Sequence, residues 1–526
     1  MKLRLPNSYT RILLSIWVVG MVLLIWRSVT LCNGHLVYAL DDPYIHLSVA
    51  ENILYGGYGV NAGEYSAPCS SIIYPFILAG TEWLGLGIFG PLVLNLLAMG
   101  ASVLLVGKIL EAYVFPATIK NNTVNLGWAF PLFLGTLLLG FVMNAWGLVM
   151  TGMEHSLHVL ACLGVVLCFL RLINDRKAST AFLLISIVFL PLIRFEGFAL
   201  AILSIIFLFY LGRPRAALGA LFAIIMVVAC WAYFMRIHQL PFFPSSVSTK
   251  SAIISSVSDD SFFSLTNFIW NNLLHSFMHS RGQVFWAGML PLIYLIVKCR
   301  PCSKDCRILG LVIFLIGLSH VIFGRFGSFS RYEIYASILI WLGVFIFLKD
   351  YFDCVRVRIG LVLVLLVIAK PNSYTLFNTP AASLNIYQQQ FQMHRFVVDF
   401  WNRPVAVNDL GYVSYRNPMY VLDLWGLGSE EMRVIKKSGE LSSPKIEALI
   451  EKKKIGMVMI YDSWFKDIVP KKWIKVASLQ TSWVTAGGSS VEFYVTSKVE
   501  LNEVRKLLSE FEMSLPPGAK LKYNKE

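Results

Sequence analysis

Charged residues are scarce in this sequence of 526 residues, making up only 14% of it. Soluble globular proteins carry about 25%, so most of the surface of this protein is not expected to face water. Hydrophobic residues reach 56%, and they gather in blocks of about 15–22 residues, the length that a helix needs to cross a hydrocarbon core about 30 Å thick. The scarcity of charge therefore excludes a chain built only of soluble domains.

Nucleotide-binding motifs are also absent, because the sequence has neither a Walker loop nor a GxGxxG turn that follows a strand. The formal net charge is +14, but the Lys and Arg residues lie in short loops between apolar blocks. This pattern indicates topology signals and contact with anionic lipid, and it argues against a nucleic-acid partner.

The nine cysteines form no disulfide framework. Cys299, Cys302 and Cys306 share one basic loop, but no fourth ligand is near them, so ordinary reduced thiols are favoured over a metal site.

The apolar blocks predict a polytopic α-helical membrane protein with about 11 transmembrane helices. The expected spans are 12–31, 89–108, 128–149, 155–170, 178–193, 198–212, 216–235, 284–298, 308–324, 334–348 and 359–370. The apolar run at the N-terminus is too long for a signal peptide and lacks a cleavage site after it, so we expect it to remain as the first helix.

The distribution of basic residues predicts the orientation of these spans. The first outer loop, 32–88, contains no Lys or Arg, whereas the loops expected on the N-terminal side are basic, which places the N-terminus in the cytoplasm. The apolar segment 70–85 would reverse every later loop if it crossed the membrane, so we expect an interfacial or re-entrant segment. An odd number of spans then places the C-terminal region outside. We therefore expect a protein of the bacterial cytoplasmic (inner) membrane whose C-terminal region lies in the periplasm.

Residues 371–526 have the composition of an extracytoplasmic α/β domain, following a membrane module of residues 1–370. Strands are predicted at Val405–Asn408, Tyr420–Leu424, Gly456–Tyr461, Trp473–Leu479 and Val491–Thr496. Helices are predicted at 381–401, 444–454 and 499–512.

Two adjacent carboxylates, Asp41 and Asp42, follow the first span. Pro43 suits the first turn of a helix with Asp42 as its N-cap, and His46 then lies on the same helical face as Asp42. One interpretation is that Asp42 only caps the helix and Asp41 is solvated. The other is a general base for a hydroxyl nucleophile, or a carboxylate pair that holds a divalent cation such as Mg²⁺ or Mn²⁺. His46 could bind a phosphate or a metal, or be structural.

Three further polar clusters lie in predicted outer turns. Glu154 follows Thr151-Gly-Met and is either a helix-dipole partner or part of an active site. Arg194 and Glu196 either pair with each other or offer a donor to phosphate oxygens. Arg331 and Tyr332 suit an anionic lipid phosphate, or Arg331 extends to the head groups.

All of these clusters are expected on the outer side of the membrane. That compartment has no supply of nucleotide sugars, so a glycosyltransferase acting there needs a sugar activated on a lipid carrier. Basic groups would hold the carrier phosphate as the leaving group, while a carboxylate deprotonates the acceptor hydroxyl.

At these residues the sequence resembles the GT-C superfamily of polyprenyl-phosphate-sugar-dependent glycosyltransferases, and more narrowly the AftB-type arabinofuranosyltransferases of bacteria. The resemblance is carried by Asp41-Asp42, 61–71, Thr151-Gly-Met-Glu154, Arg194-Phe-Glu-Gly197, Asp409-Leu-Gly411 and 421–428. The family more often reads Arg-Pro-Glu-Gly where Phe195 stands here.

The resemblance implies transfer of one sugar from a polyprenyl-phosphate donor to a glycan or glycolipid acceptor, with a first-loop acid as the base. We hypothesise that His46, Arg194 and Arg331 contact the donor phosphate, with Tyr332 beside Arg331, while Glu154 and Glu196 organise the cavity. Two alternatives stay open: a transporter or flippase of lipid-linked saccharides, for which the sequence shows no internal repeat, and a polymerase that uses diphosphate-linked donors.

Overall fold

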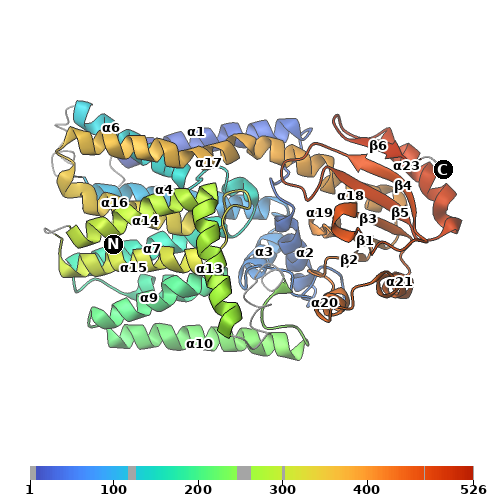
Figure 1. Ribbon diagram of the computed structural model, residues 1–526, viewed down its shortest axis with the longest axis horizontal. Helices are drawn as coiled ribbons and strands as arrows, with labels where there is room; N and C mark the ends of the chain where they lie inside the picture. The colour runs from blue at the N-terminus through green and yellow to red at the C-terminus, as the bar shows by residue number, and fades with distance from the viewer. Residues whose placement is uncertain (1–7, 116–125, 246–261, 299–301, 467, 525–526) are drawn as a thin grey trace. The chain divides into compact units, whose positions relative to one another are not determined.

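A computed structural model describes residues 8–115, 126–245, 262–298, 302–466 and 468–524 (Figure 1). The chain divides into two compact units. The helical unit comprises 1–24, 92–230 and 252–377, and the mixed unit comprises 25–91, 231–251 and 378–526. The first outer loop therefore groups with the C-terminal residues.

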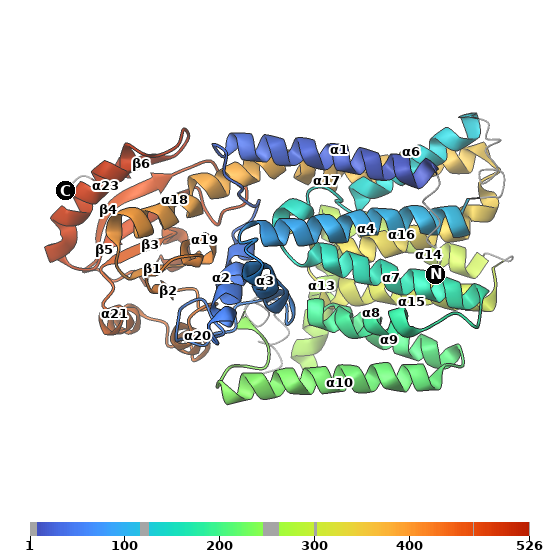
Figure 2. The ribbon, with the colours of Figure 1, turned by 180° about the vertical axis from the view of Figure 1, so that it is seen from behind.

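Long apolar helices build the helical unit. Those that lie wholly within it are α6 (Leu126–Val142), α7 (His155–Asn174), α8 (Ala181–Ile193), α9 (Gly197–Tyr210), α13 (Phe262–Met278), α14 (Ser280–Lys298), α15 (Lys304–Phe323) and α16 (Ile334–Leu348). Helices α7, α8 and α9 lie side by side (Figure 2). Short turns join them, and the turn between α8 and α9 carries Arg194 and Glu196.

Four helices run from one unit into the other: α1 (Ser8–Leu31), α4 (Phe89–Tyr113), α10 (Pro214–Ile237) and α17 (Val355–Gln388). Helix α17 is continuous over 34 residues, so the change in composition near residue 370 falls inside a helix. Pro371 follows the apolar part of α17, but the helix continues past it.

The part of the chain that is described contains eight helices long and apolar enough to cross a membrane, and three shorter apolar helices. Together these eleven coincide with the predicted spans, and the predicted polytopic helical architecture with a small C-terminal sheet domain is confirmed.

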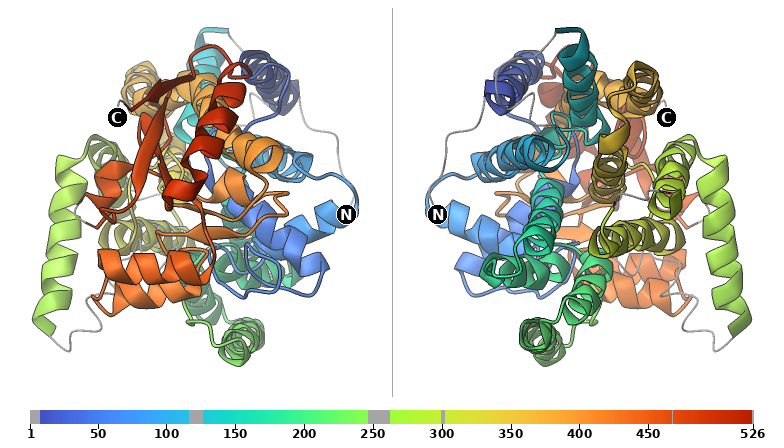
Figure 3. Two further views of the ribbon diagram at one scale, coloured as in Figure 1. Left: turned by 90° about the vertical axis from the view of Figure 1, so that its right-hand side faces the viewer. Right: turned by 90° about the vertical axis from the view of Figure 1, so that its left-hand side faces the viewer.

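One long helix of the helical unit was not predicted. The segment 236–283, expected to be a loop, contains α13, which crosses α14 and α15 instead of running along them (Figures 1 and 3). Asn272 on α13 donates to the carbonyl of Ile322 at 2.7 Å, and Trp286 donates to Ser276 at 3.0 Å. Asparagines interrupt the apolar residues of α13, so this segment does not form a long apolar run and was not predicted.

The first outer loop in the mixed unit contains α2 (Asp42–Leu54) and α3 (Tyr74–Trp83). Helix α3 has ten residues, about 15 Å at 1.5 Å per residue, which is too short to cross a bilayer. Its length agrees with the prediction that the segment 70–85 is not a span.

The C-terminal part of the mixed unit is built on a six-stranded sheet with the order β2-β1-β3-β5-β4-β6. Its strands are β1 (Val405–Val407), β2 (Val421–Asp423), β3 (Met457–Ile460), β4 (Ile474–Gln480), β5 (Ser490–Val495) and β6 (Lys520–Tyr523). The first three strands pair in parallel and the remaining pairs are antiparallel. The five predicted strands are confirmed, whereas β6, with alternating lysines, was missed.

Helices cover both faces of this sheet (Figure 3). One face packs on α20 (Glu430–Lys437) and α21 (Ser443–Lys452) through a core that includes Val458 and Leu449. The opposite face packs on α23 (Leu501–Glu512), where the ring of Phe511 meets that of Phe396 at 5.3 Å.

Short helical segments complete the mixed unit. They are α18 (Gln390–Arg395), the π-helical turn η3 (Phe396–Trp401), α19 (Gly411–Ser414) and α22 (Asp462–Phe465). Of the predicted helices, 444–454 corresponds to α21 and 499–512 to α23, while 381–401 is divided among α17, α18 and η3.

Candidate functional site

The first-loop carboxylates lie at the start of α2, but their roles differ from the predicted ones. The helix begins at Asp42, so the cap position belongs to Asp41, whose side chain makes no capping hydrogen bond. The prediction of Asp42 as the N-cap is therefore wrong by one residue, because Pro43 occupies a position within the first turn. Asp41 is also not solvated, since only 8% of it is exposed.

Asp41 is held instead by backbone groups distant in the sequence. Its Oδ2 accepts the N–H of Gly411 at 2.7 Å, and its Oδ1 accepts the N–H of Tyr412 at 2.8 Å. Both amides belong to the first turn of α19, where helix N–H groups have no partner within the helix. Asp41 thus joins the first outer loop to the C-terminal segment of the same unit.

Asp409 supplies a third carboxyl group near Asp41. Asp409 precedes Gly411 by two residues, and its Oδ2 accepts from the amide of Gln390 at 2.7 Å. Burial raises the pKa of Asp41 well above its usual range, and the adjacent Asp409 and Asp42 raise it further. Burial likewise raises the pKa of Asp409.

Asp42 is the more accessible member of the first-loop pair, because it is only partly buried. It lies in the first turn of α2, where the helix dipole favours a carboxylate. Asp42 is therefore the first-loop carboxylate better placed to exchange a proton with a bound molecule.

His46 packs inside the first outer loop. Its Nε2 lies 3.5 Å from the hydroxyl of Ser70, and its ring meets that of Tyr74 at 5.4 Å. Only 2% of the residue is exposed, which favours the structural interpretation over contact with a ligand.

The first-loop pair does not form a recognisable metal centre. No group of three or more His, Cys, Asp or Glu side chains suited to a metal occurs among the residues placed by the structure. Both oxygens of Asp41 already accept backbone N–H groups, so the donor set that a divalent cation needs is not assembled around Asp41. The proposed Mg²⁺ or Mn²⁺ site stays a prediction. Cys299 of the cysteine loop lies outside the described residues.

The helical unit holds the second candidate cluster, which we call the arginine cluster: Glu154, Arg194, Glu196, Arg331 and Tyr332. These residues come from three turns, which precede α7, α9 and α16. The structure thus brings together, within this unit, three groups that are far apart in the sequence.

Arg194 is the centre of the arginine cluster. Its Nη1 donates to Glu154 at 2.6 Å, while its Nε and Nη2 donate to Glu196 at 3.0 and 2.8 Å. The predicted ion pair between Arg194 and Glu196 is present, and Glu154 joins it as a second acceptor. Glu154 is completely buried, and a buried charge that loses its partner costs about 3–5 kcal/mol.

Tyr332 extends the cluster towards Arg331. The guanidinium carbons of Arg194 and Arg331 lie 5.4 and 5.0 Å from the centre of the Tyr332 ring, within the range of a cation–π contact. Arg331 also donates to the Tyr332 hydroxyl at 3.3 Å. Because the Arg194 nitrogens donate to glutamates, Arg331 and Tyr332 are the members better suited to an added anion.

Three aromatic polar residues of neighbouring helices were missed by sequence reasoning. His158 and Tyr335 face each other with ring centres 4.5 Å apart, and the Tyr335 hydroxyl lies 3.3 Å from Nδ1 of His320. All three are buried. Each of the three is a single polar residue inside an apolar helix, and they are far apart in the sequence, so they form no recognisable sequence pattern.

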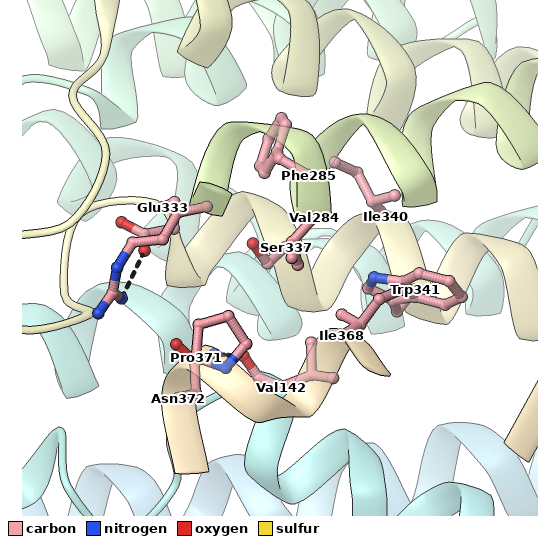
Figure 4. Close-up of a pocket in the computed structure, with 11 residues that line it drawn as sticks. Val142, Val284, Phe285, Glu333, Ser337, Ile340, Trp341, Ile368, Pro371 and Asn372 are labelled. Carbon is pink, nitrogen blue, oxygen red and sulfur yellow. Dashed lines mark hydrogen bonds and ion pairs between the residues drawn. The ribbon is translucent and has the colours of Figure 1, made fainter. Parts of the chain in front are cut away.

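A separate pocket of about 390 Å³, counting the open space at its mouth, lies among α6, α14, α16 and α17 (Figure 4). Arg281 and Glu333 form an ion pair of 3.2 Å at one end. Asn372 donates to the carbonyl of Val142 at 2.8 Å. The remaining wall is mainly apolar, and its residues include Val284, Phe285, Ile340, Trp341, Ile368 and Pro371.

The chain is similar to known proteins at two levels. Residues 384–494 match a family described as a domain of unknown function. No curated protein matches the sequence.

Solved structures provide the second level. ArnT from Cupriavidus metallidurans in the apo state is 13% identical, with 94% of this chain and 98% of that chain covered and a TM-score of 0.50. The same protein bound to undecaprenyl phosphate is 11% identical, with 92% and 98% covered and a TM-score of 0.50. An oligosaccharyltransferase from Archaeoglobus fulgidus, in complex with Zn and sulfate, is 13% identical. The match covers 98% of this chain and 74% of that chain, with a TM-score of 0.45.

These comparisons establish the fold. The likeness to ArnT extends over almost the full length of both chains, and the predicted GT-C fold of a multi-pass membrane protein is confirmed. The narrower resemblance to AftB-type arabinofuranosyltransferases stays a prediction, as does the orientation in a bacterial inner membrane.

Proposed function

We propose that this protein is a membrane glycosyltransferase that moves a sugar from a polyprenyl-phosphate donor to a hydroxyl group of a glycan or glycolipid acceptor. The observation that carries the proposal is the ArnT fold over almost the whole chain, together with the undecaprenyl phosphate bound to ArnT. That ligand has the chemistry expected of the carrier released by such a donor.

In the proposed reaction, Asp42 is the general base. Its carboxylate takes the proton from the acceptor hydroxyl as that oxygen attacks the anomeric carbon. The bond between the anomeric carbon and the phosphate oxygen breaks, and polyprenyl phosphate leaves with the electron pair. Asp41 is fixed by Gly411 and Tyr412, so we assign it a positioning role and not a second catalytic one.

The arginine cluster supplies the donor-phosphate contacts in this proposal. Arg331 and Tyr332 offer a guanidinium and a hydroxyl, which suit phosphate oxygens. Arg194 donates to Glu154 and Glu196, and we assign these three the task of holding the Tyr332 ring through the Arg194 face. The donor sugar and the acceptor are outside the proposal.

Transfer assays with the purified protein test these assignments. A panel of polyprenyl-monophosphate sugars should yield free polyprenyl phosphate, whereas diphosphate-linked donors should not. Asp42→Asn should lower kcat at least about 100-fold, the size of a general-base contribution. Asp399→Asn is the matched control, because this carboxylate of the same unit is about half exposed (52%) and should leave kcat unchanged.

Two results would count against the proposal in different ways. Full activity of Asp42→Asn would remove the base assignment. Vesicles in which the protein moves lipid-linked saccharide across the bilayer, without any transfer from the panel of donors, would show a transporter.

A further inference from the structure

A run of three buried glutamines, Gln388 to Gln390, lies where α17 meets α18. Long amide side chains are seldom buried, and a buried amide needs hydrogen-bond partners for its oxygen and nitrogen. Gln388 donates to the carbonyl of Pro517 at 2.8 Å and accepts from Ser482 at 2.8 Å. Gln389 donates to the carbonyl of Gly488 at 2.9 Å. The run is therefore fixed to two separate loops of the C-terminal domain.

Tyr461 connects this run to Asp409. The Tyr461 hydroxyl lies 2.6 Å from Oε1 of Gln389 and 3.0 Å from Oδ2 of Asp409. Gln390 donates to the same Oδ2 at 2.7 Å. The Asp409 carboxyl is thus held on one side by an amide and a phenol whose own positions are fixed. Two residues further along the chain, the turn that begins at Gly411 binds Asp41 through backbone N–H groups.

The contact between this turn and Asp41 connects Asp409 to Asp42, the proposed base. Asp41 occupies the cap position of α2, and the next residue is Asp42. Any shift of the Asp41 backbone therefore changes the position from which the Asp42 side chain leaves the helix. Other ionisable groups near Asp41 are Asp42, Tyr44 and Tyr461.

We infer that Asp409, held by Gln390 and Tyr461, is a positioning residue for the base Asp42. It acts through the turn that follows it, whose N–H groups hold Asp41. The inference rests on the proposed function for its catalytic consequence, but the structural link that it describes exists without any substrate. The C-terminal domain then takes part in the reaction by ordering the first outer loop.

Variants at Asp409 separate this role from a general loss of structure. Asp409→Asn keeps the shape and an oxygen that can accept from Gln390 and Tyr461, whereas Asp409→Leu has a similar volume and no acceptor. We expect Asp409→Leu to lower kcat at least about tenfold, which corresponds to one lost hydrogen bond of about 1.4 kcal/mol. The KM for the donor should stay within about twofold, and Asp409→Asn should recover most of the lost kcat.

A second measurement does not depend on activity. Hydrogen exchange in peptides that cover 38–50 and 409–416 should become faster in Asp409→Leu and stay near the wild-type rate in Asp409→Asn. Gln390→Met, which removes one support of Asp409, should produce the same changes to a smaller degree and serves if Asp409→Leu does not fold. Asp399→Leu is the exposed control and should alter neither exchange nor kcat.

The outcomes distinguish the two proposals. Faster exchange in Asp409→Leu, with no transfer by the wild-type protein from any donor, would support the structural link and overturn the proposed function. Unchanged exchange in Asp409→Leu would overturn the positioning role, whatever the activity. Equal losses of kcat in Asp409→Asn and Asp409→Leu would also overturn it, because the amide oxygen can still accept from Gln390 and Tyr461.

Discussion

Gly411→Ala provides a sharp test of how the first outer loop is held. Gly411 lies in α19, where helix propensity alone would make alanine more stabilising than glycine by about 1 kcal/mol. Packing predicts the opposite sign. A Cβ atom built at this position would lie 2.2 Å from the carbonyl oxygen of Asp41 and 2.4 Å from its Oδ2, far inside van der Waals contact.

The magnitude follows from the contacts that must break. Asp41 has to withdraw from the N–H groups of Gly411 and Tyr412, and hydrogen bonds to a charged group contribute about 2 kcal/mol each. The loss of both, reduced by the gain in helix propensity, leaves a net cost of about 3 kcal/mol. That cost corresponds to an approximately 100-fold larger population of the undocked loop, at about 1.4 kcal/mol per factor of ten.

Hydrogen exchange measured by mass spectrometry can test this number. Peptides that contain the Gly411 and Tyr412 amides should exchange about 100-fold faster in Gly411→Ala than in the wild type. Gly80→Ala is the matched control, because it is also a helical glycine of the mixed unit but has no atom within 4 Å of its added Cβ. Slower exchange in both variants would show that helix propensity decides the outcome and would refute the packing argument.

Three further predictions concern stability. Arg194→Ala removes the arginine that pairs with the buried Glu154 and should reduce the stability of the purified protein by about 3–5 kcal/mol. Arg176→Ala, which removes an ion pair whose arginine side chain is 50% exposed, should cost less than about 1 kcal/mol. Thermal unfolding in detergent ranks the two, and a reversed order would contradict the assignment. Asp423 accepts three backbone N–H groups, at 2.7, 2.5 and 2.8 Å, so Asp423→Ala should cost about 3 kcal/mol or more in chemical unfolding, and a loss below about 1 kcal/mol would show that the turn holds itself. Burial raises the pKa of Asp409 above its unfolded value of about 3.9, so its contribution to stability is complete below pH of about 4 and is lost as the pH rises through the raised value; a pH series of melting temperatures should be flatter for Asp409→Asn, and identical slopes would exclude the effect.

Much of the architecture could be predicted because it depends on local patterns. Long apolar runs specify spanning helices wherever they occur, and alternating or continuous apolar segments of four to seven residues specify the buried strands β1 to β5. Helix α13 and strand β6 escaped prediction for the same reason: exposed polar side chains interrupt both patterns. An element that buries few side chains needs few apolar residues, so its sequence carries only a weak hydrophobic pattern.

The candidate sites were predictable only in part. The pairing of Arg194 with Glu196 follows from a separation of two residues across a short turn. The contact of Asp41 with Gly411 joins residues 370 positions apart, and no property of Asp41 distinguishes a carboxylate that binds backbone amides from one that binds substrate. Asp409-Leu-Gly411 is one of the segments that resemble the GT-C superfamily, but its role depends on a tertiary contact that one sequence does not reveal.

Strand β2 is an edge of the six-stranded sheet, and a side chain from the first outer loop protects it. Asn61 donates to the carbonyl of Val421 at 2.9 Å and accepts the N–H of the same residue at 2.9 Å, so a side-chain amide stands in for a neighbouring strand. A fragment of residues 378–526 produced alone would lack this protection. Its bare edge would invite pairing between copies, and the fragment should self-associate unless residues 25–91 are supplied with it.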